Sequence, residues 1–140
     1  MSVLIARSDD LDACLAVRFT VFVEEQNVPV ELERDEYDAS AIHILATEEG
    51  APVGTARIIV KDGVGKIGRV AVLADQRGTG LGRKLIEACL AELSNDPEVS
   101  AAKLGSQIHA LGFYEKLGFV AEGPEFDDAG IPHRMMSRPV

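Results

Sequence analysis

The sequence predicts a single α/β or α+β domain built on a sheet of about six or seven strands. Its 140 residues match the length of one domain, and 46% of them are hydrophobic, which is enough for a buried core. Short apolar runs rich in β-branched residues recur along the chain, and segments with apolar residues at helical spacing separate them. No linker, repeat or low-complexity tract interrupts this order. We therefore expect residues 1–140 to form one domain.

The first third of the chain is expected to hold a strand, a helix and a polar segment. The apolar run at residues 3–6 predicts the strand, and the SDD sequence at 8–10 offers an N-cap with acids in the first helical turn. The helix is indicated by apolar residues at helical spacing, namely Leu11, Leu15, Phe19 and Phe22. Residues 23–40 are polar and contain Pro29, so we expect them to be irregular.

The remaining two thirds predict a meander, a long helix and the end of the sheet. Apolar runs separated by turns, at residues 41–47, 53–60 and 66–73, indicate three antiparallel strands. An amphipathic helix follows, with its apolar stripe at Leu81, Leu85, Ile86, Cys89, Leu90 and Leu93. Beyond it we expect strands at residues 99–104, 118–120 and 131–136, and helical structure within 107–116.

Charge and composition exclude several classes of function. The net charge of −9 argues against nucleic-acid binding. The chain begins without a signal peptide and has no apolar run long enough to span a membrane, so we expect a soluble cytoplasmic protein. Cys14 and Cys89 lie far apart and fit no metal-binding spacing, so no metal is expected.

Charge is unevenly distributed along the chain. Residues 24–38 contain seven acids and one base, whereas residues 61–90 contain six bases and three acids. These segments are either two solvated faces, or sites that attract a cation to the first and hold an anion at the second.

Three glycines stand between a predicted strand and a predicted helix. Gly78, Gly80 and Gly82 follow the strand that includes Val70, Ala71 and Val72. Glycines let the backbone approach a phosphate closely, and the N-terminus of a helix presents unpaired N–H groups with a partial positive charge. The loop at 77–82 therefore predicts a phosphate or pyrophosphate site, against the alternative of a flexible turn. The Walker A and dinucleotide-binding glycine patterns do not fit.

The pattern that fits is R-x-x-G-x-G, at Arg77, Gly80 and Gly82. After a V-x-V strand it resembles the pyrophosphate loop of the GNAT superfamily of N-acetyltransferases. The segment ALGFYEKLGF, at residues 110–119, resembles the second signature of that family, whose helix places a tyrosine beside the thioester sulfur. The segments VFVEEQNVP, SQIHALGFY and GIPHRMM are similar to the small bacterial ElaA-like or YjcF-like branch.

This resemblance implies a GNAT fold and acetyl transfer from acetyl-CoA, the cosubstrate, to a primary amine. The sheet would be mixed and mostly antiparallel, with helices on both faces and two splayed parallel strands at its centre. Residues implied in cofactor binding are Val70, Ala71, Val72, Arg77, Gly78, Thr79, Gly80, Leu81, Gly82, Arg83 and Gln107. A strand N–H near Val72 would bind the acetyl oxygen, and Tyr114 would act as general acid toward the leaving thiolate.

The acceptor side is less defined by the sequence. Glu25 is the expected general base, with Glu24 beside it on the acceptor side or as an alternative base. Asp38 and His43 are further alternatives. In some relatives a glutamate on the strand before the glycine loop serves as the general base, but this chain has an arginine there.

Two residues are expected to contact the acceptor. Arg69, the arginine on that strand, could bind an anionic part of the substrate, and His133 would line the acceptor pocket. The acidic segment at 24–38 favours a small cationic acceptor. The sequence leaves the oligomeric state open, with a homodimer as one alternative, because dimers are common among relatives. The alternatives are a CoA-binding or sensing module without turnover, and a domain that binds another nucleotide.

Overall fold

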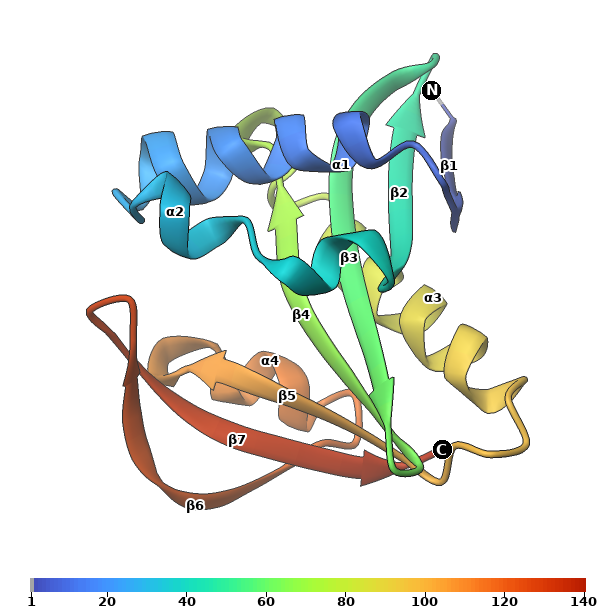
Figure 1. Cartoon of the computed structure of the whole chain (residues 1–140), viewed down its shortest axis with the longest axis vertical. Helices are drawn as coiled ribbons and strands as arrows, with labels where there is room; N and C mark the ends of the chain where they lie inside the picture. Colours follow the sequence, from blue (N-terminus) through green and yellow to red (C-terminus); the bar gives the residue numbers. More distant parts are fainter. Residues whose placement is uncertain (1) are drawn as a thin grey trace.

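The computed structural model describes residues 2–140 and contains one seven-stranded sheet (Figure 1). Its strands are β1 (Val3–Arg7), β2 (Ile42–Glu48), β3 (Ala51–Lys61), β4 (Val64–Val72), β5 (Ala101–Gln107), β6 (Val120–Asp128) and β7 (Ile131–Pro139). They lie in the order β1-β2-β3-β4-β5-β7-β6. Only the central β4–β5 pair is parallel. The predicted mixed, mostly antiparallel sheet is confirmed.

Helical segments connect these strands. They are α1 (Leu11–Arg18), a π-helical continuation (Phe19–Glu25), α2 (Val30–Glu33), α3 (Leu81–Ser94), α4 (Leu111–Glu115) and 3-10 turns at Glu36–Ala39, Ala74–Gln76 and Ile108–Ala110. The expectation that residues 23–40 are irregular was wrong. Much of this segment is helical, partly because Asp35 and Asp38 form a reciprocal capping box.

Helices α1 and α3 cover opposite faces of the sheet, as expected (Figure 1). Successive side chains of β3 point to opposite faces, so Ile58 packs beneath α3 while Arg57 faces the side of α1 and α2. A charged residue in the middle of this strand is therefore buried on a face separate from the main hydrophobic core.

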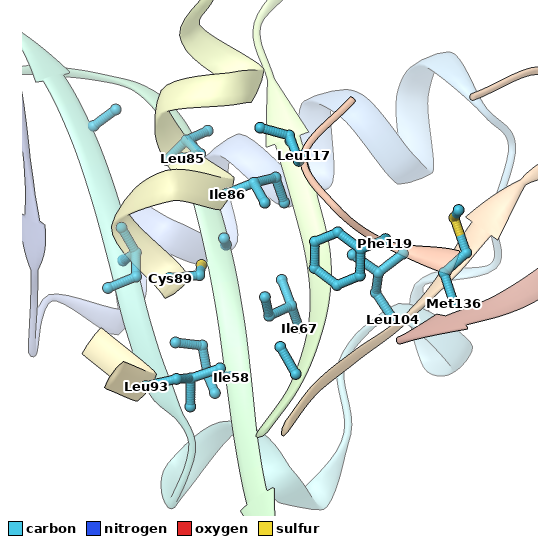
Figure 2. Packing of buried hydrophobic residues seen from close by; sticks show 14 of the residues in the cluster. Ile58, Ile67, Leu85, Ile86, Cys89, Leu93, Leu104, Leu117, Phe119 and Met136 are labelled. Atoms are coloured by element: carbon cyan, nitrogen blue, oxygen red, sulfur yellow. The ribbon is translucent and has the colours of Figure 1, made fainter. Parts of the chain in front are cut away.

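The main core lies between α3 and the sheet (Figure 2). Leu85, Ile86 and Leu93 of α3 are almost fully buried, and burial of each such side chain contributes roughly 1.5–3 kcal/mol. Contact is closest at Gly65 of β4, where a Cβ would lie 2.3 Å from Cδ2 of Leu93. The absence of a side chain at Gly65 lets the last turn of α3 lie close to the strand.

The two central parallel strands separate along their length. β4 pairs with β5 only from Val64 to Ile67, and beyond that point it pairs with β3 alone. A bulge interrupts the β3–β4 register next to Arg69, whose φ is +50°. The predicted splay is confirmed, and Figure 1 shows the two strands diverging.

Candidate active site

A cavity of about 540 Å³ lies in the fork between β4 and β5. Its wall includes five of the residues expected at the site, one or two from each surrounding element. Arg69 and Val70 come from β4, Gln107 from the end of β5, Tyr114 from α4 and His133 from β7. The fold therefore brings together residues that lie up to 64 positions apart in the sequence, since Arg69 and His133 are at its two extremes.

One edge of β4 is open along this fork. The N–H of Leu73 donates to the carbonyl of Val53 on β3 at 3.0 Å. Because successive backbone groups of a strand point to alternate sides, the N–H groups of Val72 and Val70 point away from β3. Ala71 pairs with β3 and its side chain is buried beneath α1, so only its main chain lies near the fork. The open edge can accept an extended ligand as an added half-strand.

The glycine turn continues from this edge into α3. Gly78 and Gly80 have φ of +79° and +86°, in the left-handed region that favours glycine, and Gly80 is the N-cap of α3. The first-turn N–H groups of any α-helix lack helical partners, and no side chain of residues 2–140 caps them here. The space where Cβ atoms of Gly78 and Gly80 would stand is open. This geometry fits an anion bound to main-chain N–H groups.

Residues around the turn hold it in place. Leu81 is buried beneath the sheet, and the hydroxyl of Thr79 donates to the carbonyl of Gln76. Gly82 faces the ring of Phe113, whose Cζ would lie 3.9 Å from a Cβ there. Helix α4 therefore lies beside the start of α3. Exposed Arg83 forms a 3.6 Å ion pair with Glu87 on the next turn.

Glu25 does not line the cavity. Its carboxylate pairs with the guanidinium of Arg77, whose Nε also donates to the carbonyl of Val72 at 3.1 Å. This position disfavours the expected role of Glu25 as general base and instead places it at the glycine turn. Glu24 is exposed and also lies outside the cavity wall.

Tyr114 is held by aromatic contacts at the cavity. Its ring makes edge contacts with Phe113 and Phe119, at centroid distances of 5.0 and 6.1 Å. Burial, with a smaller contribution from Cys89, raises the pKa of Tyr114 to about 12. The phenol therefore keeps its proton at neutral pH and can act only as a donor of that proton or as a hydrogen-bond partner.

His133 presents one ring nitrogen without a protein partner. Nδ1 lies 2.7 Å from the carbonyl oxygen of Ile131, and the ring stacks against Phe126 at a centroid distance of 5.8 Å. A carbonyl oxygen can only accept, so Nδ1 carries the proton and the neutral ring keeps its lone pair on Nε2. Among residues 2–140, no hydrogen bond engages Nε2. An Nε2 lone pair on a cavity residue can take up a proton.

Gln107 lies at the mouth of the fork, where β5 ends. Its side-chain oxygen is 2.7 Å from Nε2 of the exposed His109. Within residues 2–140, no hydrogen bond engages the side-chain amide nitrogen of Gln107.

A buried charge network, which no sequence motif predicted, adjoins the cavity and contributes Glu33 and Arg57 to its wall. Arg18 is 1% exposed and pairs with Glu33 and Asp38, and Arg57 pairs with Asp35 and Asp38. Single charges within the apolar patterns CLAVRF and VGTARIIV were the available signal, since a buried arginine requires acidic partners. Three acids of the segment 24–38 are therefore neutralised by arginines.

The two other candidate bases do not fit that role. Burial would raise the pKa of Asp38, but hydrogen bonds from Arg18 and Arg57 hold it well below its usual range. Such a carboxylate is a poor proton acceptor. His43 lies outside the cavity wall, and its Nε2 is 2.8 Å from the carbonyl oxygen of Asp38.

Two further features concern metals and membranes. Within residues 2–140, no group of three or more His, Cys, Asp or Glu side chains is arranged to hold a metal ion. No helix of the described chain is long and apolar enough to cross a bilayer.

Comparison with known proteins gives a consistent result. The family model described as Acetyltransferase (GNAT) domain matches residues 10–139. The chain is 40% identical to the uncharacterised N-acetyltransferase YjcF of Bacillus subtilis, covering 99% of each protein. It is also similar to the crystal structure of Escherichia coli ElaA, with a TM-score of 0.86, 31% identity and 98% coverage of both chains. A Pseudomonas aeruginosa acyl-CoA N-acyltransferase gives a TM-score of 0.87 at 30% identity, again with 98% coverage of both.

Proposed function

The chain is an N-acetyltransferase of the GNAT family, in the branch of ElaA and YjcF, and on that premise we propose that it acetylates a small primary amine with acetyl-CoA. One observation carries this proposal. The open edge of β4 has the uncapped N-terminus of α3 at one end and, at the other, a cavity lined by Tyr114 and His133. A long ligand with a phosphate group and a reactive end matches that arrangement.

Acetyl-CoA would supply an activated acetyl group whose sulfur can leave. The main-chain N–H groups at residues 78–83 would hold its pyrophosphate, because Gly80 leaves them uncapped and open. The open edge of β4 would hydrogen-bond the amide-containing arm. The N–H of Val72, which points into the fork, would donate to the acetyl oxygen as negative charge develops there.

Two side chains would handle protons in this reaction. Tyr114 donates a hydrogen bond or proton toward the departing sulfur, because its phenol stays protonated. His133 takes the proton of the attacking amine on Nε2, because its Nδ1 proton is held by Ile131. Replacement of His133 by Gln should lower kcat roughly 100-fold or more while the Kd of acetyl-CoA stays unchanged. An unchanged kcat would remove His133 from the mechanism.

In this fold the acids of residues 24–38 no longer favour a cationic acceptor. Glu33, Asp35 and Asp38 are paired with buried or half-buried arginines, and Glu25 pairs with Arg77. These four acids are not free to attract a polyamine. We therefore propose only that the acceptor is a primary amine small enough for the cavity.

Thiol release from acetyl-CoA across a panel of primary amines tests this function. The matched control is Gly80→Asp, which adds a negative charge and a side chain at a positive φ and should abolish acetyl-CoA binding. Tight acetyl-CoA binding without thiol release for any amine would instead favour a CoA-sensing module. Thermal stabilisation by ATP or NAD but not by acetyl-CoA would indicate a different nucleotide ligand.

A further inference from the structure

Arg57 has unused hydrogen-bond donors at the cavity. Its side chain is 7% exposed and belongs to the cavity wall. Nη1 donates to Asp35 at 2.7 Å and to Asp38 at 3.0 Å. Nε is buried and has no partner among residues 2–140, and Nη2 makes no hydrogen bond within the same residues. A buried N–H without an acceptor is costly, so this two-donor edge is expected to meet a ligand.

Arg69 adds a second guanidinium at the same place. The β-ladder pairs Arg57 with Gly68, so Arg69 follows directly in the bulge. Its φ of +50° is rare for a residue with a side chain, and bulges of this kind redirect side chains next to active sites. Nε and Nη2 donate to main-chain carbonyls of α2, and Nη2 also lies 3.4 Å from Oδ2 of Asp35, whereas Nη1 has no hydrogen bond within residues 2–140.

The charges of the cavity wall favour an anion. Three cations, Arg57, Lys66 and Arg69, line it against two acids, Glu33 and Asp128. Burial lowers the pKa of Arg69, and the positive charges of Arg57 and Arg18 lower it further, while the carboxylates of Glu33 and Asp35 offset this only in part. A negatively charged ligand group would relieve this repulsion.

We propose that the acceptor amine also carries a carboxylate, and that this group binds the unused Nε–Nη2 edge of Arg57 with Nη1 of Arg69 as an additional donor. The Nε and Nη2 donors of a guanidinium form a planar fork that matches the two oxygens of a carboxylate. The carboxylate would hold the acceptor so that its amine reaches the part of the cavity that contains His133 and Tyr114. This inference rests on the proposed function, because it names the acceptor class of that reaction.

Calorimetric titration of the full chain with saturating CoA tests this site without requiring turnover. The probes are glycine, β-alanine and 4-aminobutyrate, each compared with its own carboxamide. The fork should give a roughly 10- to 100-fold lower Kd for the carboxylate of the best-fitting pair, as expected for charge-assisted hydrogen bonds. Equal binding, no binding of any carboxylate, or tighter binding of phosphoethanolamine would overturn the proposal.

Variants locate the site. Arg57→Lys keeps a positive charge for Asp35 and Asp38 but lacks the fork, so the carboxylate preference should fall to less than threefold. Arg69→Gln should also weaken the carboxylate preference. Because Arg69 is more exposed than Arg57, this variant keeps the test possible if Arg57→Lys does not fold. Lys61→Gln, an exposed cation on the same strand as Arg57, is the control and should retain the preference. A preference that persists in both arginine variants would place the anion elsewhere.

The parallel thiol-release assay separates the two proposals. Carboxylate-selective binding without thiol release from any amine would leave the binding site standing and refute the proposed reaction. Thiol release with equal rates and equal binding for carboxylates and carboxamides would support the proposed reaction and refute the carboxylate site.

Discussion

Replacement of Tyr114 by Phe removes one hydroxyl from the cavity and leaves the aromatic packing in place. The ring contacts with Phe113 and Phe119 do not involve the oxygen. The hydroxyl also makes no hydrogen bond with another residue among 2–140. We therefore expect the free energy of unfolding to change by less than about 1 kcal/mol, so that any kinetic effect reports on the reaction.

The size of that effect follows from the acidity of the phenol. The pKa of Tyr114 is about 12, whereas a free thiol has a pKa of about 8.5. The difference of about 3.5 pKa units, at about 1.4 kcal/mol each, makes complete proton transfer to a thiolate unfavourable by about 5 kcal/mol. Tyr114 should therefore act mainly through a hydrogen bond to the developing thiolate. Such a bond is worth about 1.5–3 kcal/mol, or roughly 10- to 150-fold in kcat.

Steady-state thiol release with a good acceptor measures this change. The Tyr114→Phe variant should lose kcat by that factor while the KM for acetyl-CoA stays within about twofold. The matched control is Tyr37→Phe, which alters the other tyrosine of the chain, 50% exposed and outside the cavity wall. An unchanged kcat, or a loss confined to the KM, would refute the role of the phenol. A loss of more than about 10,000-fold would show that the hydrogen-bond estimate is wrong.

Three further changes test the turn, the charge network and the core. Gly80→Ala should destabilise the chain by about 1–2 kcal/mol, because the φ of Gly80 is +86°. It should also raise the Kd of acetyl-CoA, and an unchanged Kd would contradict pyrophosphate binding by the glycine turn. The paired Asp38 has a lowered pKa, so its contribution to stability is present above its usual value of 3.8 and is lost as the pH falls below it. Urea unfolding between pH 5 and pH 3 should show this loss, and Asp38→Asn should reduce it; equal slopes for both proteins would argue against the assignment. Gly65→Ala should cost about 1–3 kcal/mol because its Cβ would lie 2.3 Å from Leu93, and an unchanged Tm would mean that α3 shifts freely.

Much of the fold could be predicted from local sequence patterns. The run of β-branched residues before three glycines and an amphipathic helix predicted β4, the turn and α3, because these signals act between neighbours in the chain. The helical character of residues 107–116 was also predicted locally, whereas the role of Tyr114 within this segment came from family resemblance. The parallel strand beside β4 and the splay were predicted through family resemblance, since neither follows from local periodicity.

The roles of the charged residues could not be predicted in this way. The acids of residues 24–38 were interpreted as a cation-attracting surface, although four of the seven pair with arginines. Asp38 lies 20 residues from Arg18 and 19 from Arg57, so the partners become visible only after folding. Glu25 likewise meets Arg77, 52 residues away.

The sequence alone therefore determined the meander of β2, β3 and β4, the glycine turn and helices α1 and α3, because strand, turn and helix preferences are set within a few residues of one another. It also determined the open turn with its uncapped helix, since glycine at Gly80 supplies both the positive φ and the absence of a capping side chain. Only the tertiary structure decided which charges are neutralised, which nitrogen of His133 keeps a lone pair, and which donors of Arg57 stay unused. Those properties depend on distances between side chains that are remote in the chain, and on the burial that makes each unpaired group costly.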